Sequence, residues 1–405
     1  MLGKTFAVLA LTASLGALAI TPSLASSKRA TESSPWFDTN SNAAGSRANP
    51  TEKVLSLTAV TKAKYLRSVV VPPIPPKAQC QEDVAAPVLV GGYLYLITNG
   101  SLSKYNAATG KLVWRRIPDR TFGTIYDSLA VSGNLVVLGG FDCLSASEPV
   151  GNLWAYNTST GALMWSNGGP EGREIDDAVI ATSYVITEGA DAIGSVAQVF
   201  NLNNGNFVWS TQQGCGIGGH AVVVDLVVIS YGCDTQGQAT LEGNGLTTGA
   251  LLWTLPGNWT IQRGDLSGSL GRHLYVTNPS GAAVDLNPLT GQVRYSLNGA
   301  GTVLAVDTSR VYATCGNNGL ELCAYNISTG ALEWQNTQLS ASLAAEADGV
   351  LYLQSGAVLN AATGHTITTG LGKYILGASA IAVGDGRIAV VTVHQVLDFF
   401  GLPGY

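Results

Sequence analysis

The chain has 405 residues, and its 21 lysines and arginines against 27 aspartates and glutamates give a net charge of −6 at pH 7. The basic residues form no long run, which argues against a nucleic-acid partner, because backbone phosphates demand concentrated positive charge. Only 12% of the residues are charged and 49 are glycine, a composition typical of many short strands joined by tight turns.

Residues 1–25 have the pattern of a secretory signal peptide. Lys4 supplies the charged start, an apolar run follows, and small residues up to Ala25 precede the expected cleavage point. A membrane anchor is the alternative, but the apolar run is short and is followed by Pro22. We therefore expect a secreted protein, located outside the cell or on the exterior of the envelope, with no membrane span.

Residues 26–63 are polar and rich in Ser, Asn and Ala. This composition predicts an extended N-terminal arm that lies on the folded domain or is partly disordered. The next segment, "KYLRSVVV" at 64–71, has the apolar and β-branched content of a strand. We place the folded domain at residues 64–405.

A ten-residue pattern recurs through that domain. Its copies are "YNAATGKLVW", "YNTSTGALMW", "FNLNNGNFVW", "NGLTTGALLW", "LNPLTGQVRY", "YNISTGALEW" and "LNAATGHTIT", with their glycines at Gly110, Gly161, Gly205, Gly249, Gly291, Gly330 and Gly364. The glycines are 34–51 residues apart, a period typical of propellers.

Each copy predicts a strand, a turn and a second strand. In six of the seven copies an asparagine four residues before the glycine can fold its amide onto the backbone, and the glycine accepts positive φ in the turn. A large ring on the outgoing strand, at one constant offset, is suited to packing neighbouring units together. These predicted docking residues are Trp114, Trp165, Trp209, Trp253, Tyr295 and Trp334.

A further apolar hairpin precedes each copy, so each period supplies four strands, named A to D, which make one propeller blade. After the last copy the chain offers only three more strands before it stops. The segment 64–71 can supply the fourth and close the ring, which removes an exposed edge. We predict an all-β fold, an eight-bladed β-propeller of four-stranded antiparallel blades closed by N- and C-terminal strands, with seven blades as the alternative.

These residues resemble the tryptophan-docking repeat of the quinoprotein-type, pyrroloquinoline quinone-like propellers, A-x-D-x-x-T-G-x-x-x-W. Ala155–Trp165 and Ala324–Trp334 follow that pattern with Asn in place of Asp, and the stretch from Trp36 onward is similar to the lead-in of secreted bacterial members. The repeat is shared by quinone-dependent dehydrogenases and by non-enzymatic relatives such as the outer-membrane assembly lipoprotein. The resemblance therefore implies a fold and leaves the activity open.

The dehydrogenases of this group imply pyrroloquinoline quinone and calcium in a central funnel, often under a disulfide between adjacent cysteines. This chain has no Cys-Cys pair and no C-x-x-C-H for haem attachment. We expect no cofactor; the quinone and calcium belong to the enzymatic alternative.

Six cysteines in an exported chain predict three disulfides, and blade order favours Cys80–Cys143, Cys215–Cys233 and Cys315–Cys323. All six fall in connections that enter strand A or join B to C, which emerge on one face of a propeller. We call this the loop-bearing face. A metal cluster is the alternative, but the close C-x-x-C pairs of zinc sites are absent.

The same face should carry any ligand site, because the starts of the A strands converge on the axis there. The candidate ligand-binding residues are Asp127, Asp176, Asp177, His220, Trp259, Arg263 and Asp265. Such a mouth could hold a cation or a polar ligand. The alternative interpretation is that these are solvated loop residues and turn formers.

The leading functional hypothesis is a secreted, non-enzymatic binding or scaffold module that presents its loop-bearing face to a protein or polysaccharide at the cell surface. The first alternative is a quinone-dependent alcohol or sugar dehydrogenase that uses Asp176 or Asp265 with Arg263. The second is a polysaccharide lyase or hydrolase that uses carboxylates in the funnel. We expect a monomer.

Overall fold

Strands dominate the computed structural model, which describes residues 38, 40–69, 87–98, 100–118, 124–142, 150–168, 175–191, 194–212, 214–215, 221–265, 272–316, 319–367, 369–392 and 397–402. All of them belong to the unit Ser33–Tyr405. The predicted signal peptide lies outside the described residues. Within the described ranges, none of the helices combines the length and the apolar composition that crossing a bilayer needs.

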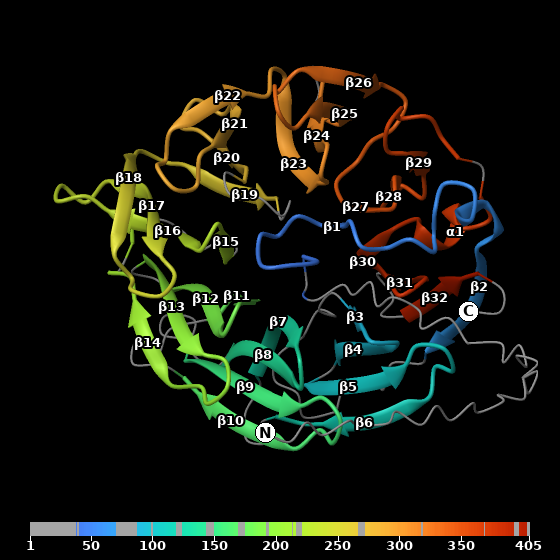
Figure 1. Ribbon diagram of the computed structural model, residues 1–405, viewed down its shortest axis with the longest axis horizontal. Helices are drawn as coiled ribbons and strands as arrows, with labels where there is room; N and C mark the ends of the chain where they lie inside the picture. The colour runs from blue at the N-terminus through green and yellow to red at the C-terminus, as the bar shows by residue number, and fades with distance from the viewer. Residues whose placement is uncertain are drawn as a thin grey trace, which may run out of the picture. The chain divides into compact units, whose positions relative to one another are not determined.

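The described strands form eight four-stranded sheets, arranged as blades around an axis (Figure 1). In blades 1–6 the strands A to D follow one another along the chain. Blade 1 consists of β3 (Val88–Val90), β4 (Tyr93–Thr98), β5 (Ser101–Asn106) and β6 (Leu112–Arg116). Blade 2 consists of β7 (Thr124–Ser132), β8 (Leu135–Asp142), β9 (Gly151–Asn157) and β10 (Leu163–Asn167). Blade 3 consists of β11 (Asp177–Ala181), β12 (Tyr184–Asp191), β13 (Gly194–Asn201) and β14 (Phe207–Ser210).

Blades 4–6 repeat this order. Blade 4 consists of β15 (Val222–Val224), β16 (Val227–Cys233), β17 (Ala239–Gly245) and β18 (Leu251–Pro256). Blade 5 consists of β19 (Thr260–Gly264), β20 (Leu274–Thr277), β21 (Ala283–Leu286) and β22 (Val293–Ser296). Blade 6 consists of β23 (Ala300–Val306), β24 (Arg310–Cys315), β25 (Glu321–Asn326) and β26 (Leu332–Asn336).

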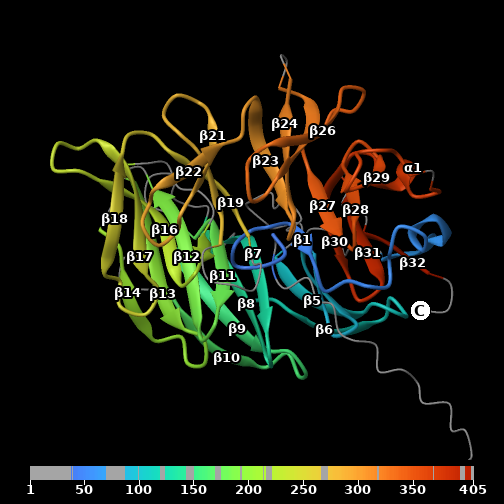
Figure 2. The same cartoon turned by 45° about the horizontal axis from the view of Figure 1, so that its top comes forward.

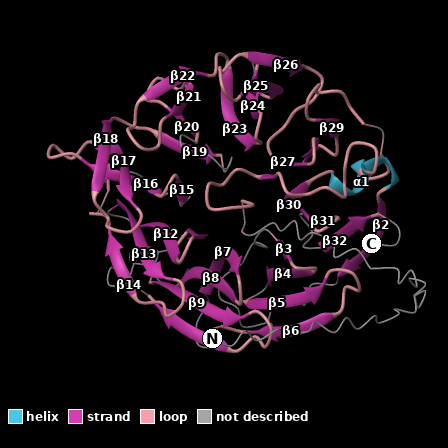
Figure 3. Cartoon of the chain, in the orientation of Figure 1, coloured by secondary structure: helices cyan, strands magenta, loops and turns pink. Residues whose placement is uncertain are grey.

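Blades 7 and 8 each take one strand from the N-terminal part of the chain. Blade 7 has β27 (Ala344–Ala347), β28 (Val350–Leu353) and β29 (Val358–Asn360), with β1 (Ala48–Asn49) parallel to β27 on the inner side. Blade 8 has β30 (Ala378–Gly384), β31 (Arg387–Thr392) and β32 (Leu397–Gly401), with β2 (Lys64–Val69) as its outer strand. The short helices are η1 (Val60–Lys62) and α1 (Gly372–Ile375) (Figure 3).

The predicted ring closure is confirmed. Strand β2 pairs antiparallel with β32, from Lys64 opposite Gly401 to Val69 opposite Leu397. The eight-bladed count is therefore right and the seven-bladed alternative is wrong. Blade 7 differs from the predicted pattern, because after β29 the described outgoing segment makes only an isolated bridge between Leu359 and Thr366.

The repeat forms the turn that its residues predict. Asn157 Oδ1 accepts hydrogen bonds from the amides of Ser159 and Thr160, and Gly161 has φ 67°. The glycine also allows close approach, since a Cβ at Gly205 would lie 2.5 Å from the ring of Trp165 in the preceding blade.

The tryptophans join blades 1–4 and 6 to the blade that follows. Their rings cover the repeat glycine of the following blade, and their indole N–H groups also donate to its main chain. The donors and accepting carbonyls, 2.7–3.1 Å apart, are Trp114 to Thr158, Trp165 to Leu202, Trp209 to Leu246, Trp253 to Pro288 and Trp334 to Ala361. At the fifth joint the hydroxyl of Tyr295 donates to the carbonyl of Ile327 in the same way.

Arg67 takes the place of the tryptophan at the joint that closes the ring. The pairing register of β2 shifts just before Arg67, as the register of β10 shifts just before Trp165. Its Cδ atom would lie 2.6 Å from a Cβ at Gly110, and its guanidinium donates to the carbonyl of Ala108. The arginine thus supplies an apolar stem and an N–H donor, as an indole does.

Residues 40–49 lie inside the ring, where Figure 1 and Figure 3 show the segment crossing the centre and the tilted view of Figure 2 shows β1 beside β27. Their carbonyls accept hydrogen bonds from the A strands of successive blades. The pairs are Val223 to Ala43, Gly264 to Ala44, Val306 to Ser46 and Glu346 to Arg47, and Asn49 donates its side-chain amide to the carbonyl of Val383.

This placement differs from the expected arm on the surface of the domain. The polar side chains of the segment are buried because they bond to one another: Asn42 Nδ2 donates to Ser46 Oγ at 2.6 Å, and Ser41 Oγ to the carbonyl of Ala48 at 2.7 Å. Small side chains at Ala43, Ala44 and Gly45 let the backbone pass close to the A strands. We call residues 40–49 the axial segment.

Arg67 should behave as the closing residue of the ring. Replacing it with Ala should lower the free energy of unfolding by about 2 kcal/mol, because both the stem contact and the bond to Ala108 are lost. Arg67→Trp should retain most of that stability, since tryptophan fills the matching position in five other blades. Urea unfolding measures both, with Lys64→Ala in the same strand as the control; an Arg67→Ala variant as stable as the control would contradict this role.

Removing the axial segment should destabilise the propeller even though β2 remains. A chain that begins at residue 50 loses the five hydrogen bonds to the A strands, which at about 1 kcal/mol each amounts to about 5 kcal/mol. A chain that begins at residue 36 keeps them and should unfold like a chain that begins at residue 26. Thermal unfolding of the two chains decides, and identical melting temperatures would show that the segment contributes nothing.

Candidate functional site

Among the described candidate residues, Arg263 is bound directly by the axial segment. Arg263, near the end of β19, is 8% exposed. Its Nη1 donates to Asn40 Oδ1 at 3.2 Å and to the carbonyl of Gly45 at 3.0 Å. The guanidinium that could have bound a ligand in an open funnel is therefore bound by the protein's own chain.

Several ionisable groups surround this contact. Burial, reinforced by the nearby Asp177 carboxylate, raises the pKa of Asp38 to about 8, although a hydrogen bond from the Asn40 amide and the charge of Arg263 oppose the shift. Burial lowers the pKa of Arg47 to about 10. It also lowers the pKa of Arg263 well below its usual range, with the charge of Arg47 acting in the same direction.

Asp176 and Asp177 enter β11 on the loop-bearing side of the channel. Asp176 is half-buried and donates its amide to the carbonyl of Glu188, and Asp177 is buried and lies opposite Glu188 in the sheet. Burial, and then the charges of both aspartates, raise the pKa of Glu188 well above its usual range. Glu188 was missed at the sequence level, although a glutamate within the apolar run "YVITEGA" was the available signal.

Arg263 and Asp265 do not lie at the start of their A strand, contrary to the sequence interpretation. Strand β19 begins at Thr260, directly after the turn at Gly257–Trp259, so Arg263 is near its end and Asp265 follows it. Asp265 therefore sits on the side of the A-to-B and C-to-D turns, which we call the turn face. The strand begins earlier than expected because the D-to-A connection is so short.

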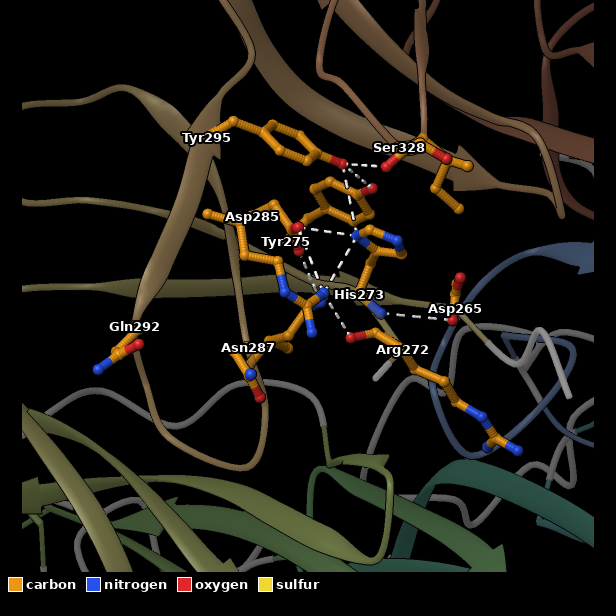
Figure 4. A network of polar contacts seen from close by, with 12 residues as sticks. Asp265, Arg272, His273, Tyr275, Asp285, Asn287, Gln292, Tyr295 and Ser328 are labelled. Carbon is orange, nitrogen blue, oxygen red and sulfur yellow. Dashed lines mark hydrogen bonds and ion pairs between the residues drawn. The ribbon is translucent and has the colours of Figure 1, made fainter. Parts of the chain in front are cut away.

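Asp265 borders a polar network between blades 5 and 6 (Figure 4). His273 Nδ1 lies 2.7 Å from Asp285 Oδ2, and Arg294 Nη1 is 3.4 Å from the same oxygen. The hydroxyls of Tyr275 and Tyr295 are 3.0 Å apart.

The position of this network indicates a structural role. Tyr295 is the residue that replaces tryptophan at this joint, and its hydroxyl bonds to Ile327 in the next blade. The buried carboxylate of Asp285 is shared by His273, Arg294 and the amide of Leu274. The histidine and aspartate thus hold a blade joint, where the smaller tyrosine needs additional partners.

The remaining candidates lie on the loop-bearing face or outside the described residues. Trp259 is half-buried before β19, and its indole donates to the carbonyl of Pro256 at 3.0 Å. Asp127 lies in β7, but its side chain is outside the description, as is all of His220. Among the described residues, no three side chains of His, Cys, Asp or Glu are grouped so that they could hold a metal ion.

Two of the predicted disulfides are present and brace this face. Cys215–Cys233 links the connection entering blade 4 to the end of its B strand, and Cys315–Cys323 spans the B-to-C connection of blade 6. Cys80 and Cys143, predicted to form the third, lie outside the described residues.

A family model described as Outer membrane protein assembly factor BamB matches residues 56–227 and 238–385. The chain belongs to this family. The match spans the repeats and most of the blades described above. No curated protein matches the chain.

Solved structures share the fold at low sequence identity. BamB from Moraxella catarrhalis aligns with 17% identity and a TM-score of 0.58, over 85% of this chain and 98% of that one. The quinohemoprotein alcohol dehydrogenase ADHIIG from Pseudomonas putida HK5 gives 12% and 0.61, over 92% and 81%. A europium-containing methanol dehydrogenase gives 12% and 0.59, over 91% and 98%. At such identities the likeness shows the propeller and no more.

Buried carboxyl groups in the channel should make the free energy of unfolding of the protein depend on pH. The pKa values of Asp38 and Glu346 are both raised by burial to about 8, from ordinary values of 3.8 and 4.5. Groups with raised pKa values favour the folded state at low pH, so this contribution should be complete near pH 4 and lost as the pH rises to about 8.

Asp38→Asn should therefore raise the free energy of unfolding at pH 9 by at least about 2 kcal/mol and change it little at pH 4. Denaturant unfolding at the two pH values measures this. An equal effect at both would show that the carboxyl is not buried as described.

Proposed function

We propose that the protein is a secreted, non-enzymatic propeller that binds a protein partner through its loop-bearing face. The observation that carries the proposal is the axial segment, which occupies the channel and holds Arg263. A propeller whose interior is bound by its own chain interacts with other molecules through its faces. The family description, an assembly factor, supports a protein as the partner.

The construction of the loop-bearing face supports this role. The disulfides Cys215–Cys233 and Cys315–Cys323 hold connections of blades 4 and 6. Fixing loops before binding reduces the entropy lost on association. Trp259 and Leu320 add apolar surface beside these braces, and Leu320 is 53% exposed.

The enzymatic alternatives fit the residues less well. The quinone interpretation needs Arg263 beside Asp176 or Asp265 in an open funnel, yet Arg263 is held by Asn40 and Gly45. Arg263 and Asp265 both lie at the turn-face end of β19, whereas Asp176 precedes β11 on the loop-bearing side. The described residues thus do not fit the assumed quinone site. The lyase or hydrolase reading needs converging carboxylates, but Asp177 is buried and Asp265 lies on the turn face.

The test compares two leucines of equal exposure. Leu320→Asp alters the loop-bearing face, whereas Leu163→Asp alters outer strand β10, where Leu163 is 54% exposed. The immobilised propeller should retain a discrete envelope protein from the organism that produces it. When that partner is purified, its affinity for the propeller should fall by about tenfold or more with Leu320→Asp and stay unchanged with Leu163→Asp.

Pyrroloquinoline quinone with calcium should give no binding heat and no dye reduction on alcohols and aldoses. Equal losses with both leucine variants, or quinone-dependent turnover, would contradict the proposal.

A further inference from the structure

The turn face carries a pocket that is lined by none of the candidate residues predicted from the sequence. Near the axis, blades 2, 3 and 4 and the axial segment enclose a half-open pocket of about 320 Å³. Its walls are mostly apolar, from Val131, Ile180, Ala181 and Val223, and Ala43 of the axial segment contributes as well. We call this the turn-face pocket.

The backbone at its mouth is unusual. Asp225 and Leu226 form the A-to-B turn of blade 4 with φ of 51° and 63°, both in the left-handed region. The matching turns of blades 7 and 8, Asp348–Gly349 and Asp385–Gly386, place glycine at the second position, which glycine adopts without strain. Blade 4 instead holds a leucine there, 56% exposed and lining the pocket.

A large apolar side chain that is both strained and exposed weakens the fold, so its presence suggests a role in binding. Thr182, the other pocket residue with positive φ, lies in the corresponding turn of blade 3 at 53°. Three strained turn positions thus converge on one pocket mouth.

The charges around the pocket are paired with each other. Arg272 Nε lies 3.5 Å from Asp225 Oδ1, and the Arg272 amide donates to Asp225 Oδ2 at 2.9 Å. The carboxyl of Asp38, which also lines the pocket, has its pKa raised by burial to about 8 and is neutral at pH 7. A neutral occupant suits such a site better than an ion.

We propose that the turn-face pocket receives one uncharged aromatic or large aliphatic side chain of a protein partner, with Leu226 packing against it. Enclosed cavities suit free small molecules, which bury most of their surface, whereas a half-open pocket suits a group still attached to a larger body. An apolar centre with an ion pair at its edge is the usual anatomy of a binding hot spot. This proposal rests on the proposed function in one respect, namely that the group bound in the pocket belongs to a protein partner.

Capped amino acids test the pocket without knowledge of the partner. Saturation-transfer NMR on the full mature chain should detect binding of N-acetyl-tryptophanamide or N-acetyl-leucinamide and no binding of N-acetyl-asparaginamide. Leu226→Gly should weaken binding by about tenfold. Its melting temperature should stay the same or rise, because the backbone strain is relieved.

Ala181→Phe, which fills the pocket, should abolish binding. Leu289→Ala, which removes an exposed leucine from a turn of blade 5 on the same face, should leave binding unchanged. If Ala181→Phe does not fold, Leu226→Gly alone decides.

No binding of either apolar probe, or binding that Leu226→Gly leaves intact, overturns the proposal. The loop-bearing face is tested separately with Leu320→Asp, so either proposal can fail without the other.

Discussion

The inner edges of the blades impose the constraint on which the rest of this structure depends. Each A strand faces the axis with backbone amides that need partners, since unpaired buried N–H groups are costly. In blades 4–7 the carbonyls of the axial segment, from Ala43 to Arg47, accept these hydrogen bonds one blade after another. At the circumference, five tryptophans, Tyr295 and Arg67 join blades 1–6 and 8 to the blade that follows. The N-terminal part of the chain therefore contributes to both sets of contacts. Its axial segment binds the inner edges of the blades, and its strand β2 then closes the ring at the outer edge.

Sequence alone predicted what depends on local chemistry repeated at a regular spacing. Asn157, Gly161 and Trp165 specify a turn and a docking ring within ten residues, so the blade and its count could be inferred. The axial segment could not, because Asn42 and Ser46 are polar side chains that satisfy each other only in the folded channel. Arg67 carried no signal, since it imitates tryptophan through an aliphatic stem and a guanidinium. Arg263 was misplaced because strand β19 starts earlier than its polar sequence suggested.

The two faces of the propeller are built differently, which bears on function. Disulfides brace the loop-bearing face at blades 4 and 6, and Trp259 and Leu320 provide apolar surface there. The turn face is made of short turns, among which Asp225 and Leu226 are strained. The channel between them contains Asp38, Arg47 and Arg263, whose pKa values are shifted chiefly by their burial. The interior of this propeller therefore serves stability, and we propose that recognition belongs to the faces.

Hydrogen exchange offers the most direct test of the claim that the axial segment is part of the folded interior. Mass spectrometry can follow a peptide covering residues 40–49 beside peptides from the A strands β15 and β23, which bond to it. The account predicts that all three exchange on the same slow timescale and lose protection together as denaturant is added. Rapid exchange across residues 40–49, with the A strands still protected, would contradict it.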